Sequence, residues 1–169
     1  MPGASPRDAA VTSPEAPPLL GHGFHWQDLA PGQRFRTFRR TVTEADLMGF
    51  VAITGMQEPL FVDATHAGAL GSRPVPAALT HALIEGMLLR GMVHGTGLAL
   101  LETRLRALAP VRVGDTIGAE VEITAIRPTS RGGRGVVTSA VRVMNQHGEA
   151  VMEYDVTRLL AGRTEGDAK

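Results

Sequence analysis

Hydrophobic residues recur at helical spacing in two stretches of the chain. The first is residues 43–55, where Thr43 can cap a helix and Asp46, three residues on, gives a weaker form of the capping box. Gly55 is placed to end this helix in a left-handed conformation. The spacing predicts a helix with one buried face, formed by Leu47, Phe50, Val51 and Thr54.

The second stretch, residues 77–93, is apolar on most sides. A helix with this pattern is buried inside a fold and does not lie on its surface. Pro74 and Pro76 hold the preceding segment extended, and Pro76 also suits the first turn of a helix. Between the two stretches, Asp63 is predicted to cap a short helix over residues 64–70.

Alternation of apolar and polar residues dominates the rest of the chain and predicts strands. One early strand is expected over residues 34–42. Four more are expected to follow the second helix as a meander, with turns between them at residues 109–115, 128–133 and 145–148. Their predicted ranges are 98–108, 117–125, 136–143 and 151–160.

A buried helix within an antiparallel sheet predicts an α+β fold in which the curled sheet wraps around a long central helix. Such a sheet keeps an open edge, which favours edge-to-edge association of two chains. The hydrophobic pattern covers residues 23–162, which are expected to form a single domain. Residues 1–22, rich in Pro, Ala and Ser, are expected to be a disordered tail, and residues 163–169 a polar C-terminal tail.

Composition narrows the classes of function. Lys+Arg and Asp+Glu number 17 each, so the formal net charge is zero, and no basic block suggests a nucleic-acid binder. Cysteine is absent, which excludes disulfides, thiolate metal sites and a cysteine nucleophile. The six histidines are scattered without a metal-binding motif, and no apolar run is long enough to cross a membrane. We therefore expect a cytoplasmic protein without a metal or cofactor.

Four short motifs give the chain a resemblance to a known family. They are residues 43–46 followed by Phe50 and 54–55, residues 73–75, residues 110–116, and residues 145–149. In this order they resemble the MaoC-like dehydratases, the hotdog-fold (R)-specific enoyl-CoA hydratases. The resemblance extends over about residues 24–160 and implies a hotdog fold. It also implies an acyl-CoA or acyl-carrier-protein thioester as partner, and a homodimer or a heteromer with another hotdog chain.

The family's chemistry is the addition of water to an enoyl thioester, with an Asp and a His acting on one water. The resemblance implies that these residues lie in a pattern of the form GD-x-N-P-x-H-x-D. Here Gly55, Pro59 and Asp63 match, but Met56 stands at the Asp position and Phe61 at the His position. Neither side chain can transfer a proton, a step typically worth ~10²–10⁴-fold in rate.

Other residues are left as candidates for the site. Glu58 is a candidate base if it points into an acyl tunnel, and a solvated turn residue otherwise. His81, on the central helix, is a second catalytic candidate, although a structural role is the commoner explanation for a histidine at such a position. A helix N-terminus can bind the thioester carbonyl through its backbone N–H groups. The candidates for substrate binding are Met56, Phe61, Asp63, Arg73, Ala77, Ala78 and Thr80.

Three functions remain open. The first is a hydro-lyase of the hydratase or dehydratase kind with an altered active site. The second is a catalytically inactive hotdog subunit that binds acyl-CoA or supports an active partner chain. The third is a hotdog thioesterase, which needs a carboxylate on or near the central helix, where Glu85 is the candidate.

Overall fold

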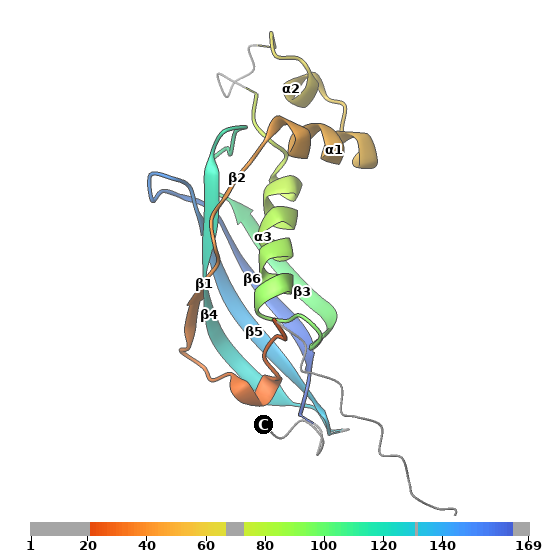
Figure 1. Ribbon diagram of the computed structural model, residues 1–169, viewed down its shortest axis with the longest axis vertical. Helices are drawn as coiled ribbons and strands as arrows, with labels where there is room; N and C mark the ends of the chain where they lie inside the picture. The colour runs from red at the N-terminus through yellow and green to blue at the C-terminus, as the bar shows by residue number, and fades with distance from the viewer. Residues whose placement is uncertain (1–20, 67–72, 131, 164–169) are drawn as a thin grey trace, which may run out of the picture.

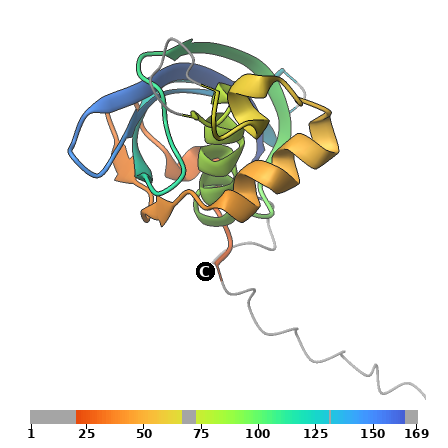
Figure 2. The same cartoon turned by 90° about the horizontal axis from the view of Figure 1, so that it is seen from above.

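A single antiparallel sheet curls around one long helix, as Figures 1 and 2 show. The computed structural model describes residues 21–66, 73–130 and 132–163. Most of the two predicted tails lies outside these residues. The helix, α3 (Ala77–Gly91), is the predicted central helix, and its buried face is formed by Leu79, Thr80, Ile84, Met87 and Leu88. The predicted α+β architecture is therefore confirmed.

The sheet has the order β1-β4-β5-β6-β3, and β2 also pairs with β4. Its strands are β1 (Arg34–Arg36), β2 (Arg40–Thr41), β3 (Gly97–Ala107), β4 (Thr116–Pro128), β5 (Arg134–Met144) and β6 (Ala150–Ala161). The predicted meander of four strands is wrong at its first member. Although β3 precedes β4 in the chain, it pairs with β6 at the far edge of the sheet. The early strand, predicted as continuous, is divided into β1 and β2.

Alternation along the strands separates an inner face from an outer face. On β6 the inner face carries Met152, Tyr154, Val156, Arg158 and Leu160, all buried, and the core against α3 is built from residues of this parity. The outer face carries charges of alternating sign in neighbouring strands. One row of paired positions crosses five strands and consists of Arg36, Glu120, Arg142, Glu153 and Arg106. Residues of opposite charge therefore lie next to each other along this row.

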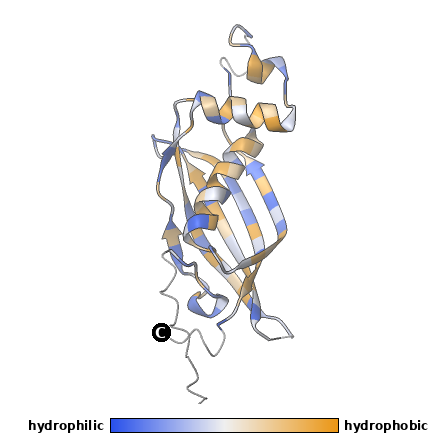
Figure 3. Cartoon of the chain, turned by 45° about the vertical axis from the view of Figure 1, so that its right-hand side comes forward, coloured by the Kyte–Doolittle hydropathy of each residue, from blue (hydrophilic) through white to orange (hydrophobic). Residues whose placement is uncertain are grey.

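The first predicted helix is α1 (Glu44–Thr54), and its ends are those that the sequence indicated. Asp46 N–H donates to the Thr43 hydroxyl at 3.2 Å, and Thr43 N–H donates back to the Asp46 carboxylate at 2.9 Å. Gly55 ends the helix with φ of 71°. The apolar residues of α1 (Figure 3) are not all buried, since Ile53 is 87% exposed.

A short helix, α2 (Pro59–Val62), follows α1 and lies above the start of α3 (Figure 1). The helix predicted over residues 64–70 is not found in its described part, where residues 64 and 65 form a turn, and residues 67–70 lie outside the described residues. Asp63 ends α2 instead of beginning a helix. Its carboxylate accepts hydrogen bonds from the backbone N–H of Thr65 at 2.8 Å and from the Thr65 hydroxyl at 2.6 Å.

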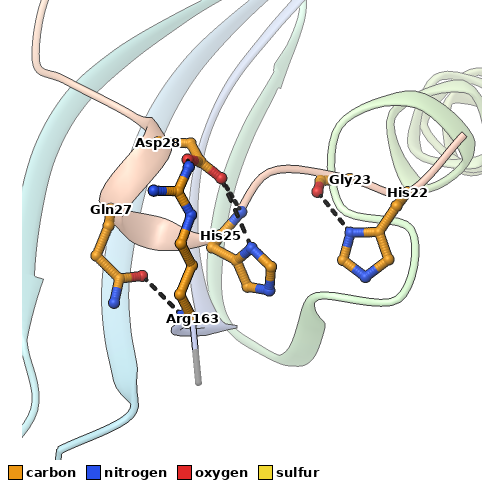
Figure 4. A network of polar contacts seen from close by, with 6 residues as sticks. All are labelled: His22, Gly23, His25, Gln27, Asp28 and Arg163. Carbon is orange, nitrogen blue, oxygen red and sulfur yellow. Dashed lines mark hydrogen bonds and ion pairs between the residues drawn. The ribbon is translucent and has the colours of Figure 1, made fainter. Parts of the chain in front are cut away.

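The N-terminal segment lies at the opposite end of the curled sheet, where it forms η1 (Trp26–Asp28). Trp26 packs so closely on β5 that a Cβ at Gly135 would lie 2.5 Å from its ring. Figure 4 shows how Arg163 fastens η1 to the end of β6. Its backbone N–H donates to Gln27 at 3.1 Å, and its guanidinium pairs with Asp28.

Candidate functional site

A cavity of about 340 Å³ lies at the N-terminus of α3, and we call it the α3 N-terminal cavity. Five parts of the chain meet there: α2, the linker before α3, the first turns of α3, the end of β3 with the turn after it, and the start of β6. Its lining residues are Leu60, Phe61, Pro74, Val75, Ala77, Thr80, Ala107, Leu108, Ala109, Pro110, Val111, Val151 and Met152.

The wall of this cavity is apolar, and its main polar features belong to α3. Of the thirteen lining residues, all in the described part of the chain, none carries a titratable side chain. Thr80 contributes the one side-chain hydroxyl among them and is only 1% exposed. The helix begins after Pro76, and no side chain caps its first turn. Its N-terminus therefore offers backbone N–H groups and the positive end of the helix dipole to an oxygen in the cavity.

Three of the nine predicted site residues line this cavity: Phe61, Ala77 and Thr80. Phe61 is positioned by α2, and the linker carries Arg73 beside it. The Arg73 guanidinium donates to the Phe61 carbonyl at 3.4 Å and to the Glu44 carboxylate at 2.5 Å. Arg73 thus joins α1, α2 and the linker.

The other predicted residues do not line the cavity. Met56, Glu58 and Ala78 are exposed, and Glu58 is the residue that precedes Pro59 at the start of α2. Asp63 is also exposed, and the side-chain and backbone hydrogen bonds from Thr65 lower the pKa of its carboxyl below the usual 3.8.

His81 lies one residue beyond Thr80 and belongs to a separate polar cluster between α3 and β6. Its ring packs edge-on against Tyr154, with 4.8 Å between ring centroids. The His81 Nε2 atom is buried and has no hydrogen-bond partner among the described residues.

The remaining members of this cluster are Tyr154, Glu85 and Arg158. The Tyr154 hydroxyl donates to Glu85 Oε1 at 2.7 Å, and Arg158 Nη2 lies 2.7 and 2.5 Å from the two Glu85 oxygens. Burial, followed by the negative charge of Glu85 and the hydrogen bond to it, raises the pKa of Tyr154 well above its ordinary value, against the smaller effect of Arg158. Tyr154 is therefore a neutral donor to Glu85 at physiological pH.

Glu85 was a candidate from the sequence, whereas its two partners, Tyr154 and Arg158, were not. A signal was available in β6, because Arg158 has the same alternation parity as the apolar residues Met152, Val156 and Leu160. A charge at such a position requires a buried partner of opposite charge.

Neither a metal centre nor a membrane-spanning helix is found in the described part of the chain. No group of three or more His, Asp or Glu side chains in that part of the chain is arranged to hold a metal ion. In the same residues, no helix is long and apolar enough to cross a membrane.

The family model and the curated protein that this chain resembles are both of the dehydratase or hydratase kind. The family model for the FAS1-like dehydratase domain region matches residues 30–154. An (R)-specific enoyl-CoA hydratase from Aeromonas caviae is 31% identical over 123 residues, which cover 72% of this chain and 88% of that protein.

Solved structures agree with these sequence matches. A MaoC-like dehydratase from Rhodospirillum rubrum superposes with a TM-score of 0.76 at 26% identity, covering 84% of this chain and 99% of that one. A conserved hypothetical protein from Mycobacterium tuberculosis with a double hotdog fold gives a TM-score of 0.77 at 20% identity, covering 87% of this chain and 47% of that one. The chain therefore belongs to the MaoC-like hotdog family, and the family model that it matches is that of the FAS1-like dehydratase domain region.

Proposed function

We propose that the chain binds an acyl thioester in the α3 N-terminal cavity and has no proton-transfer groups of its own there. The observation that carries this proposal is the lining of the cavity, in which none of the thirteen residues is titratable. Membership of the family makes an acyl thioester the expected ligand. The positions that the family pattern assigns to Asp and His hold Met56, which is exposed, and Phe61, which lines the cavity as an apolar wall.

Binding would use the two kinds of surface that the cavity offers. The thioester carbonyl would accept hydrogen bonds from backbone N–H groups at the start of α3, where the helix dipole favours partial negative charge. The Thr80 hydroxyl, which lines the same cavity, would be a further donor. The apolar walls, with Phe61 and Met152 among them, would bury the acyl chain.

The open edge of the sheet supports association with a second hotdog chain as part of the same proposal. β3 is the last strand of the sheet, and its leucines Leu98, Leu100, Leu101 and Leu105 are between 38% and 58% exposed. An apolar edge of this kind is unfavourable in water unless another strand covers it. The partner would be a second copy or another family member that carries the dyad. We also propose a cytoplasmic location, on the basis of the missing cysteines.

Hydration by this chain alone is the second candidate function. One observation favours it, because Glu58 precedes the wall residues Leu60 and Phe61 by only two and three positions. A movement of α2 would bring the Glu58 carboxylate to the cavity. His81 would then be the second candidate for proton transfer. A thioesterase role has less support, because the Glu85 carboxylate is held by Arg158 and Tyr154.

Ligand binding and turnover can be measured separately with the full chain. Butyryl-CoA should raise the melting temperature, since a ligand at 100 times its Kd stabilises a protein by about 2.7 kcal/mol. Ala77→Leu, which narrows the cavity, should abolish this rise. Ala82→Leu, at an exposed position of the same helix outside the cavity, is the matched control.

The turnover assay decides between the candidate functions. We expect no hydration of crotonyl-CoA by the chain alone. Hydration that Glu58→Gln abolishes would replace the proposal with the hydro-lyase alternative. Release of free CoA from butyryl-CoA would support the thioesterase, and failure of any acyl-CoA to bind would reject all three.

A further inference from the structure

A second cavity, of about 520 Å³, lies at the opposite end of α3 and shares no lining residue with the first. It is bounded by the C-terminal turns of α3, by the N-terminal segment and by β1 with the residues after it. In Figure 1 these parts meet at the end of the molecule opposite α1 and α2. We call it the α3 C-terminal cavity. Its volume is in the range of small-molecule sites.

Aromatic and aliphatic side chains form the walls of this cavity. Phe24 and Phe35 stack with 5.2 Å between ring centroids, and Met87, Leu88 and Met92 of the α3 end complete the apolar surface. Phe38, at the rim, is 59% exposed, a high value for a phenylalanine in a chain that contains only five. A ligand with an apolar body would bury this surface.

Two arginines line the same cavity, and their guanidinium groups have no ion-pair partner among the described residues. Arg36 and Arg90 are both exposed, and neither forms an ion pair or a side-chain hydrogen bond with any described residue. Arg36 is paired in register with Glu120, but the Glu120 carboxylate is bound by Arg34 at 2.7 Å. Arg90 also lies in the last turn of α3, where its charge is favourable to the helix dipole. That role does not explain Arg36, which belongs to the sheet.

The combination of an apolar interior with two free guanidinium groups selects the class of ligand. We propose that the α3 C-terminal cavity binds a fatty-acid carboxylate, with the hydrocarbon chain against the phenylalanines and methionines and the carboxylate between Arg36 and Arg90. Guanidinium groups bind carboxylates with short, charge-assisted hydrogen bonds. A nucleotide base would need polar groups for its ring edges. The Thr37 hydroxyl, the one neutral polar side chain in the lining, already accepts a hydrogen bond from the Ala119 N–H at 2.9 Å.

Calorimetric titration of the full chain with decanoate, and with 1-decanol as the uncharged probe, tests the proposal. Decanoate should bind more tightly than decanol. Arg36→Gln and Arg90→Gln should each weaken decanoate binding about tenfold, the effect of losing one charge-assisted contact, and leave decanol binding unchanged. Arg127→Gln, at an exposed arginine of β4 outside the cavity, is the matched control.

A steric block gives an independent arm. Gly91 lines the cavity, and a Cβ built there meets no atom within 4 Å, so the side chain of Gly91→Leu starts from a sterically open position. It should abolish the binding of both probes. Gly49→Leu, at a helical glycine of α1 that is equally open, should leave binding intact.

Three results would overturn the proposal. The first is that decanoate does not bind. The second is that decanoate binds equally well to the wild type, to both arginine variants and to Gly91→Leu. The third is that Gly91→Leu loses an oligomeric state that the wild type has, while no fatty acid binds. The second result would place decanoate outside the α3 C-terminal cavity, and the third would assign that cavity to a second copy of the chain. The acyl-CoA experiment is independent, because its variants lie at the other end of α3.

Discussion

Arg158 Nη2 lies 2.7 Å from one carboxylate oxygen of Glu85 and 2.5 Å from the other, which joins the inner face of the sheet to the middle of α3. The Arg158 side chain is 6% exposed and that of Glu85 15% exposed, so both charges have lost most of their water. A pair of this kind adds little net stability, but the loss of one partner leaves an uncompensated charge.

The first prediction concerns this pair. Arg158→Met should lower the free energy of unfolding by about 3 kcal/mol, because it leaves the Glu85 carboxylate buried without a cation. The double variant Arg158→Met/Glu85→Leu should recover most of that loss. Urea unfolding of the wild type, both single variants and the double variant measures the coupling. Additive losses in the double variant would show that the pair does not act as a unit.

Tyr154 gives a prediction for alkaline pH. Its folded pKa is raised above the usual 10.0, chiefly by burial and then by Glu85, so its contribution to stability is present below pH ~10 and is lost as pH rises further. Tyr154 is the only tyrosine and Lys169 the only lysine, so few other groups titrate in this range. Tyrosinate absorbance should appear only when the protein unfolds. Ionisation of the folded protein near pH 10 would contradict the prediction.

The capping box at the start of α1 predicts a loss at acid pH. Burial alone would raise the pKa of Asp46, but hydrogen bonds from the Thr43 backbone and side chain and the charge of Arg40 lower it below 3.8. Its contribution is therefore present above pH ~4 and is lost as pH falls through the folded pKa. Thr43→Ala should cost about 1 kcal/mol at pH 7 in urea unfolding. Asp46→Asn should destabilise at pH 7 and have less effect at pH 3, whereas an equal cost at both would refute the linkage.

The close approach of Trp26 to β5 makes Gly135 intolerant of a side chain. Gly135→Ala would place a Cβ 2.5 Å from the indole, so the ring must shift, at a cost of about 1–3 kcal/mol. Gly49→Ala is the contrasting control. Its Cβ is unobstructed within α1, and the helix propensity of alanine should stabilise the protein by up to about 1 kcal/mol. Melting temperatures of the two variants should move in opposite directions.

The last prediction concerns a dimer formed by two chains that associate through their β3 edges. The wild type should sediment as a dimer, and Leu100→Lys, which puts a charge on the exposed edge, should shift it to monomer. Ile53→Lys, at an even more exposed apolar position on α1, is the control and should stay dimeric. A dimer that persists in Leu100→Lys would place the interface elsewhere.

Local patterns were sufficient for α1, α3 and the four long strands, but not for α2 or for the division between β1 and β2. The capping residues of α1, the left-handed Gly55 and the range of α3 follow from contacts within a few residues, which the sequence contains directly. The strands were also found within a few residues of their observed ends, because alternation reports burial on one face of a sheet.

Local patterns did not determine which distant segments pair with each other. Nothing in residues 98–108 specifies that β3 pairs with β6 instead of β4, since both neighbours offer the same alternation. The short helix was expected after Asp63, but α2 forms before it and brings Leu60 and Phe61 to the α3 N-terminal cavity.

The sequence by itself determined the buried central helix and the sheet that covers it, and it places Met56 and Phe61 in the segment that leads to the α3 N-terminal cavity. Tertiary structure alone decided which residues surround each end of α3, and that Glu85 is bound by Arg158. The physical reason is that periodicity encodes which side of an element is buried. The identity of the groups that meet there depends on strand order and on packing between distant segments, such as those of Glu85 and Arg158, which are 73 positions apart.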